Sequence, residues 1–168
     1  MQKKSLLNCF DNPQLLYVSR IRSLKIIGIS VRTTNENGQA AQDIGALWNK
    51  FMSEGVLDKI PNKINNDIYS VYTDYESDYT KPYTTILGCK VKNIDVAVPN
   101  GMVMKDIDDG NYVTFVAKGN LTKGLVYEEW LKIWNSDLER KYTADFELYG
   151  KKAQNPTNAE VAIFVAVK

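Results

Sequence analysis

Residues 144–150 read Ala-Asp-Phe-Glu-Leu-Tyr-Gly, an alternating pattern that predicts a β-strand ending at the glycine. Because successive side chains of a strand point to opposite faces, Asp145, Glu147 and Tyr149 share one face. Phe146 and Leu148 share the other face. If the polar face lines a cleft, the Glu147 carboxylate is a negative charge beside aromatic rings, which suits an organic cation. The alternative is an exposed strand face solvated by water, since Glu residues are usually exposed.

The overall composition predicts one globular domain and excludes several classes of site. The chain has 168 residues, of which 44% are hydrophobic and 24% charged, ordinary values for a folded domain with a core. Its formal net charge is +1, so no overall field favours nucleic acid or an anionic membrane as a partner. There is no histidine, which excludes Ser-His catalytic triads, His-bound zinc and His-ligated haem.

The cysteines and the apolar segments bear on location and cofactors. The two cysteines, Cys9 and Cys89, are neither spaced as a metal site nor numerous enough for a disulfide framework. No apolar run is long enough for a signal peptide or a membrane span. We therefore expect a cytoplasmic protein without a metal or a cofactor.

The periodicity predicts two similar halves, each reading strand, helix, strand, strand. One helix is indicated by Ile44, Leu47, Trp48 and Phe51 and is expected to end at Gly55; the other is indicated by Val126, Trp130, Trp134 and Leu138. The strands are predicted at 24–32, 68–75, 83–91, 102–107, 112–118, 145–149 and 161–167. We expect an α+β fold in which two βαββ pseudo-repeats form a largely antiparallel sheet with two helices and a central groove. Residues 1–22 are interpreted as an N-terminal extension and residues 23–168 as the domain.

The order of these elements and several local motifs together resemble the GyrI-like effector-binding domains, the small-molecule-sensing modules of multidrug-responsive transcription regulators. The chain is most similar to the stand-alone integron-associated effector-binding proteins within that group. The resemblance runs from about Leu24 to the C-terminus. The segments that carry it are 44–51 (Ile-Gly-Ala-Leu-Trp-Asn-Lys-Phe), 68–79 with Tyr-Glu-Ser-Asp, 130–134 (Trp-Leu-Lys-Ile-Trp), 145–149 (Asp-Phe-Glu-Leu-Tyr) and 161–168.

The resemblance implies a pocket for lipophilic, often cationic compounds, lined by aromatic rings and holding an acidic residue at the Phe-Glu-x-Tyr position. In this sequence that residue is Glu147. In the regulators the domain follows a DNA-binding helix-turn-helix module, for which the residues before Leu24 are too few. We therefore expect small-molecule binding, as a sensor, a sequestering protein or an accessory of transcription regulation, without direct DNA binding.

The expected ligand-binding residues surround Glu147. Rings near a cation contribute about 0.5 to 2 kcal/mol each, and tyrosine hydroxyls can stabilise a buried carboxylate by hydrogen bonds. Trp134 is favoured over Trp130 because it matches the family's tryptophan before Phe-Glu-x-Tyr. For Trp48 and Trp134, which lie at matching positions on the two helical stripes, the alternative is core packing of helix on sheet. The candidate set is Glu147, Tyr149, Trp134, Tyr112, Tyr83, Tyr72 and Trp48.

Two other functions stay open at this stage, because some GyrI-like proteins hydrolyse reactive cyclopropane-containing toxins and others are linked to gyrase inhibition. In the first, Glu147 is a general acid or base for an electrophilic substrate. In the second, the protein acts through its surface on a larger partner. No catalytic residue is assigned.

Overall fold

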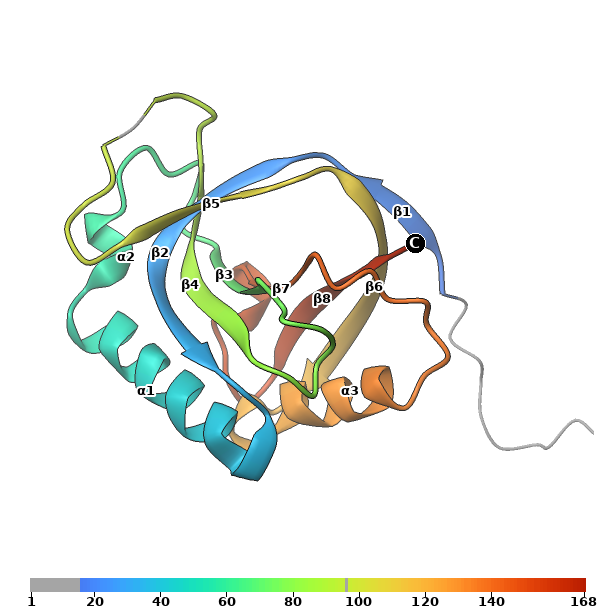
Figure 1. The fold of residues 1–168 in the computed structure, drawn as a ribbon. Helices are drawn as coiled ribbons and strands as arrows, with labels where there is room; N and C mark the ends of the chain where they lie inside the picture. The colour runs from blue at the N-terminus through green and yellow to red at the C-terminus, as the bar shows by residue number, and fades with distance from the viewer. Residues whose placement is uncertain (1–15, 96) are drawn as a thin grey trace, which may run out of the picture.

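The computed structural model describes residues 16–95 and 97–168, which contain eight strands and three α-helices (Figure 1). The helices are α1 (Gln39–Ser53), α2 (Val56–Lys59) and α3 (Leu125–Trp134). The strands are β1 (Val18–Ile21), β2 (Leu24–Thr33), β3 (Ile68–Thr73), β4 (Tyr83–Val91), β5 (Val103–Ile107), β6 (Gly110–Gly119), β7 (Ala144–Tyr149) and β8 (Ala159–Val167). None of the described helices is long and apolar enough to cross a membrane.

The strands form one antiparallel sheet in the order β1-β6-β8-β7-β3-β4-β2-β5. The two predicted halves meet at its centre, where β7 of the second half pairs with β3 of the first. The order outward from this central pair is the same in both halves. The last strand of the half lies next (β4 or β8), and its first strand lies beyond (β2 or β6). The predicted α+β fold with a largely antiparallel sheet is confirmed.

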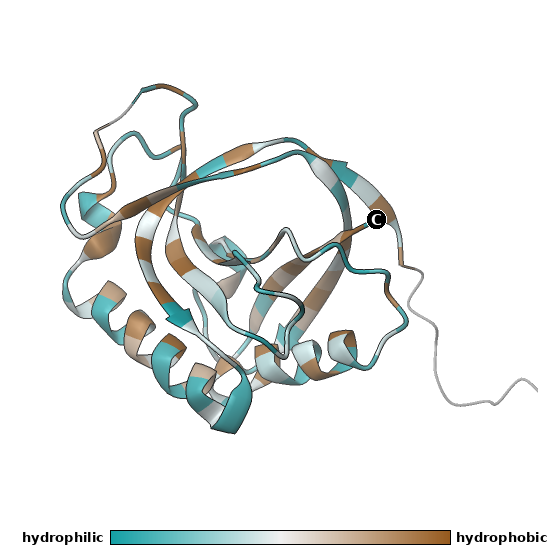
Figure 2. Cartoon of the chain, viewed as in Figure 1, coloured by the Kyte–Doolittle hydropathy of each residue, from teal (hydrophilic) through white to brown (hydrophobic). Residues whose placement is uncertain are grey.

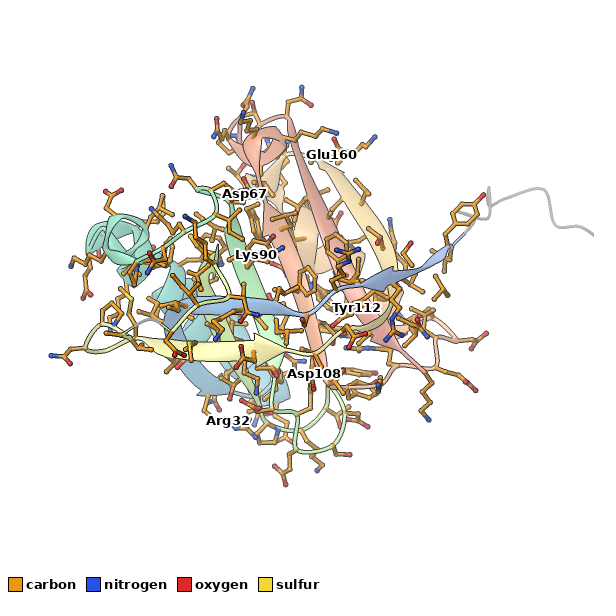
Figure 3. All side chains as sticks on the ribbon, turned by 90° about the horizontal axis from the view of Figure 1, so that it is seen from above. Arg32, Asp67, Lys90, Asp108, Tyr112 and Glu160 are labelled. Carbon is orange, nitrogen blue, oxygen red and sulfur yellow. The ribbon has the colours of Figure 1, made fainter. Side chains whose placement is uncertain are left out.

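The sheet curls back on itself. β1 at one end of the strand order runs into β2 near the other end, and the two pair with β6 and β5 respectively. β1 pairs with β6 from Val18↔Val113 to Ile21↔Gly110. β2 pairs with β5 from Leu24↔Ile107 onward. The register of the β1–β6 pairing therefore continues into the β2–β5 pairing without a shift. β1 and β2 form one band that crosses over the sheet, with β5 beside it (Figures 1 and 3). β1 lies inside the predicted extension 1–22, of which residues 1–15 fall outside the described part.

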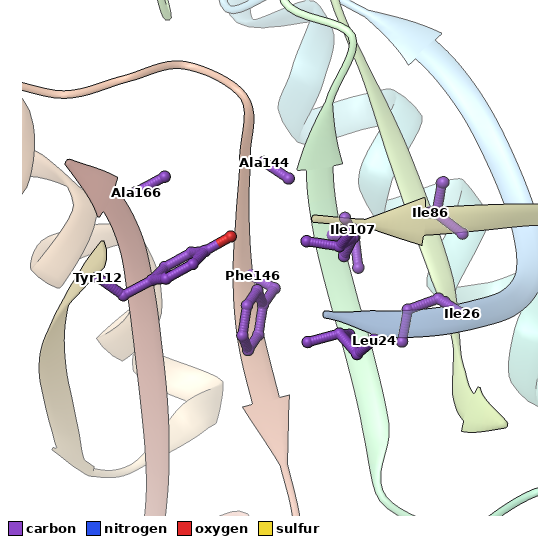
Figure 4. Close-up of a cluster of buried hydrophobic side chains, with 9 residues drawn as sticks. Leu24, Ile26, Ile86, Ile107, Tyr112, Ala144, Phe146 and Ala166 are labelled. Atoms are coloured by element: carbon purple, nitrogen blue, oxygen red, sulfur yellow. The ribbon is translucent and has the colours of Figure 1, made fainter. Parts of the chain in front are cut away.

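Each face of the curled sheet has its own core. The inner face holds a cluster that includes Tyr112, Phe146 and Leu24 (Figure 4). On the outer face, α1 packs over β2 and β4, and α3 lies against β6. Both helices carry a hydrophobic stripe (Figure 2). The buried residues of these stripes are Leu47 and Phe51 on α1 and Trp130 and Ile133 on α3.

The helix ends follow local chemistry. α1 ends at Ser53, and Gly55, with φ 61°, takes the left-handed conformation at the turn into α2. α3 ends at Trp134, one turn before the predicted end of its stripe, and just beyond this end the Ser136 hydroxyl donates a hydrogen bond to the Ile133 carbonyl at 2.6 Å. Leu138 therefore lies beyond the helix, although it still packs against the same core.

Candidate functional site

The outer face of the sheet has a cavity of about 680 Å³ between α1 and α3, over the central strands β3 and β7. It forms there because α1 covers the first half of the sheet and α3 covers the second, which leaves the junction of the halves uncovered. The volume is within the range of small-molecule sites. Its aromatic lining consists of Trp48, Tyr72, Tyr75, Tyr79, Tyr83, Tyr127, Trp130, Trp134 and Tyr149.

Glu147 lies in the wall of this cavity, held by three neutral donors. Its Oε1 accepts hydrogen bonds from the Tyr72 hydroxyl at 2.8 Å and from the Trp130 Nε1–H at 2.7 Å. Its Oε2 accepts a hydrogen bond from the Tyr149 hydroxyl at 2.7 Å. The Ser70 hydroxyl donates in turn to the Tyr72 oxygen at 3.2 Å. The carboxylate is therefore fixed in position by side chains of β3, β7 and α3.

No described Lys or Arg forms an ion pair with Glu147. The residue is only 2% exposed, and this burial raises the pKa of the carboxyl, while the hydrogen bonds from Tyr149, Trp130 and Tyr72 lower it in part. Burial also raises the pKa values of Tyr72 and Tyr149 well above the usual range, so both hydroxyls remain donors. The ionised carboxylate therefore has no counter-charge among the described residues.

The rings around Glu147 pack edge to face. The Tyr72 ring lies 5.4 Å from that of Trp130, and the Tyr149 ring lies 5.0 Å from that of Trp48. Farther along the wall, Trp134 stacks on Tyr79 at 5.2 Å. These contacts join rings from both helices and both central strands, so the aromatic wall is part of the packed structure.

A second buried charge system borders the cavity. Arg140 lines the cavity, and its Nη2 donates to Asp145 Oδ2 at 2.8 Å. Asp145 also accepts hydrogen bonds from the Tyr75 hydroxyl at 2.7 Å and from the Ala166 backbone N–H at 2.8 Å. The Arg140 guanidinium lies over the Tyr142 ring, 4.4 Å from its centre. Unlike Glu147, Asp145 has its counter-charge within the protein.

The structure brings together all but one of the predicted binding residues. Glu147, Tyr149, Trp134, Tyr83, Tyr72 and Trp48 all line the cavity. Tyr112 does not: it points to the inner face, packs against Phe146 at 5.6 Å and borders a separate cavity of about 270 Å³. Tyr112 shares its face of β6 with Thr114 and Lys118. The alternation in the sequence does not show which face of the strand lies toward α3.

Several residues that line the cavity carried little or no signal in the sequence. Trp130 was ranked below Trp134, yet it is the tryptophan that contacts Glu147. Its place on the helical stripe was the available signal. Tyr75 and Tyr79 belong to the segment whose acidic residues Glu76 and Asp78 are absent from the cavity lining. Arg140 follows α3 in an irregular segment and carried no sequence signal.

The chain matches known proteins over nearly its whole length. Residues 20–167 match the family model described as integron-associated effector binding protein. An integron cassette protein from the mobile metagenome of Vibrio cholerae is 33% identical, with a TM-score of 0.70, and the match covers 92% of this chain and 97% of that protein. YobU of Bacillus subtilis (strain 168), named as a candidate transcriptional regulator, is 26% identical over 90% of this chain and 97% of its own.

A third relative shows the same fold at lower identity. The structure of SAV2435 bound to tetraphenylphosphonium has a TM-score of 0.73 and 18% identity, covering 91% of this chain and 93% of SAV2435. The family inferred from the Phe-Glu-x-Tyr segment and the other quoted motifs is thus confirmed by the family model and by the Vibrio protein. The chain belongs to the integron-associated effector binding protein family.

Proposed function

We propose that this protein binds lipophilic organic cations in the cavity between α1 and α3, with Glu147 as the counter-charge. The observation that carries the proposal is the Glu147 carboxylate, which is buried among aromatic rings and, within the described part of the chain, is held by neutral donors alone. A buried carboxylate without a counter-ion is unfavourable. A cation that enters the cavity supplies the missing charge.

The surroundings of Glu147 favour a cation that is large and apolar. Inside a site of low dielectric constant, opposite charges attract far more strongly than in water. The rings of Trp48, Tyr72 and Tyr149 add cation–π attraction and apolar contact. Rings also tolerate many shapes, because one methylene group changes affinity by only about 1 to 3 kcal/mol. The cavity is therefore suited to a class of cations rather than to one compound.

Two relatives support this use of the cavity. SAV2435 shares the fold and was solved with tetraphenylphosphonium, a lipophilic cation. YobU is named as a candidate transcriptional regulator. We assign this chain the role of a sensor or sequestering protein for such cations.

The test is a titration with tetraphenylphosphonium followed by tryptophan fluorescence. Trp130 and Trp48 line the cavity, so binding changes their emission. We expect micromolar affinity in the wild-type protein and at least a tenfold loss, about 1.4 kcal/mol, in Glu147→Gln. Neutral triphenylphosphine oxide should show a much smaller difference between the two proteins. Because the charge pair is buried, affinity should depend only weakly on salt.

A matched control separates the site from overall charge. Glu160→Gln removes the same charge from β8, where Glu160 forms ion pairs with Lys118 and Lys152 at the surface (Figure 3). This variant should bind like the wild type. Urea unfolding of all three proteins checks that they are folded. Equal affinities of the wild type and Glu147→Gln, with both proteins folded, contradict the proposal.

A further inference from the structure

We propose that Arg140 is a second recognition point in the same cavity, and that the ligand is a cation that also carries a neutral hydrogen-bond acceptor such as a carbonyl oxygen. The inference rests on the proposed cation site and specifies the class of ligand. Its basis is a set of buried N–H groups in the cavity wall for which the described residues offer no acceptor.

Arg140 is buried but only partly satisfied. Its side chain is 4% exposed, and its Nη2 donates to Asp145 Oδ2. Its Nε and Nη1 have no hydrogen-bond partner among the described residues. Asp145 already accepts from Tyr75 and from the Ala166 backbone. A buried donor without an acceptor is unfavourable, so these N–H groups favour any acceptor that enters.

The rings near Arg140 do not replace that acceptor. Its Cζ lies 4.4 Å from the centre of the Tyr142 ring and 5.7 Å from that of Trp130. Rings stacked on a guanidinium contact its faces, whereas its N–H bonds lie in the plane of the group. These ring contacts therefore leave the buried Nε and Nη1 of Arg140, a residue of the cavity lining, without an acceptor among the described residues.

Charge balance decides what kind of acceptor fits. Asp145 neutralises Arg140, so the two together add no net charge to the cavity wall. Glu147 leaves it with one negative charge. A ligand carrying one positive charge and a neutral acceptor balances the site, whereas a carboxylate on the ligand restores an excess negative charge in a poorly solvated place.

The geometry also limits the spacing within the ligand. Trp130 connects the two recognition points, because its Nε1–H donates to Glu147 at 2.7 Å while its ring lies 5.7 Å from Arg140 Cζ. Cation and acceptor should therefore be separated by a distance comparable to one indole side chain. Esters and amides with a short linker to a quaternary nitrogen have this form.

The test compares two cations of equal length that differ in the acceptor. Benzoylcholine carries an ester between its ring and its trimethylammonium group, and (4-phenylbutyl)trimethylammonium carries methylene groups in its place. We expect the wild-type protein to bind benzoylcholine at least tenfold more tightly, because hydrogen bonds to charged donors are strong. The quantity compared between proteins is the ratio of the two affinities, so a general loosening of the cavity cancels.

Two variants assign the preference to Arg140. Arg140→Lys keeps a positive charge beside Asp145 but lacks the planar set of donors, and the affinity ratio should fall toward one. Because a change at this buried pair can prevent folding, Arg140→Gln combined with Asp145→Asn provides a variant without a lone buried charge. In the wild type, the ¹⁵N–¹H resonance of Arg140 Nε should shift with benzoylcholine and much less with the hydrocarbon cation.

The outcomes separate this inference from the proposed function. If both cations bind the wild type with equal affinity, the role of Arg140 is wrong and the cation site stands. If the ratio stays unchanged in both folded variants, the acceptor contacts another group and the inference is again wrong. If tetraphenylphosphonium binds the wild type but neither of these cations does, the inference is wrong and the proposed function stands. If tetraphenylphosphonium does not bind either, both fail.

Discussion

Asp145 and Glu147 are two buried carboxylates on the same face of β7, separated by one residue, yet the protein treats their charges differently. Asp145 has a guanidinium partner, Arg140, at 2.8 Å and accepts a backbone N–H from β8. Glu147 has neutral donors only. Strand pattern and burial are the same for both residues. The difference in their partners comes from the segments that pack against each residue: the segment that carries Arg140 at Asp145, and α3 and β3 at Glu147.

The chain around Arg140 explains this difference. Arg140 forms an isolated bridge with Val167, at the end of β8, so its backbone is fixed beside Asp145. Asp145 thereby links this segment to β7 and β8. Around Glu147 the approaching groups are aromatic side chains of α3 and β3. The charge of Asp145 is compensated inside the fold, whereas the carboxylate of Glu147 is available to a cation from outside.

The largest effect predicted by this comparison is on stability. Asp145→Asn should destabilise the protein by about 3 to 5 kcal/mol, because it leaves the Arg140 charge buried without its partner. Glu147→Gln, the same acid-to-amide change, should leave stability equal or raise it, since it removes an uncompensated charge. Urea unfolding at neutral pH measures both. Similar losses in the two variants would mean that Glu147 also has a structural counter-ion.

The second prediction concerns pH. Burial raises the pKa of Glu147, and the protonated acid must lose its proton before it can pair with a cation. Tetraphenylphosphonium affinity should therefore fall as the pH is lowered through this raised pKa, by about tenfold per pH unit below it. Over two units the loss is ~2.7 kcal/mol.

Titrations from neutral pH down to the lowest pH at which the protein stays folded test this profile, with Glu147→Gln as the variant that should show no such dependence. The stability of the protein without ligand should show the opposite pH dependence and decrease as the pH rises. A carboxyl with a raised folded-state pKa binds more protons when folded, so its contribution to stability is lost as the pH rises from the unfolded pKa through the folded one. A wild-type affinity independent of pH would contradict an ionisable Glu147 at the site.

The sequence predicted the placement of side chains correctly where a strand has one polar face or a helix has one apolar stripe. The alternation in 145–149 placed Glu147 and Tyr149 together, and the helical stripes located Trp48 and Trp134, because period and burial are coupled in such elements. It failed where the alternation does not show which face of a strand lies toward the helices, as for Tyr112 on β6. It also failed where a contact joins irregular segments, as for Arg140, whose position depends on the closed sheet and not on local periodicity.

The smallest predicted effect distinguishes the two tryptophans of α3 by their relation to Glu147. Trp130→Phe keeps a ring but removes the Nε1–H that donates to Glu147. Losing this donor raises the pKa of Glu147 further, so the midpoint of the pH profile should move up by about one unit, ~1.4 kcal/mol. Trp134→Phe removes a ring stacked on Tyr79 and no donor to Glu147, so its midpoint should stay at the wild-type value. Equal midpoints in the two variants would show that the Trp130 hydrogen bond does not stabilise the charge.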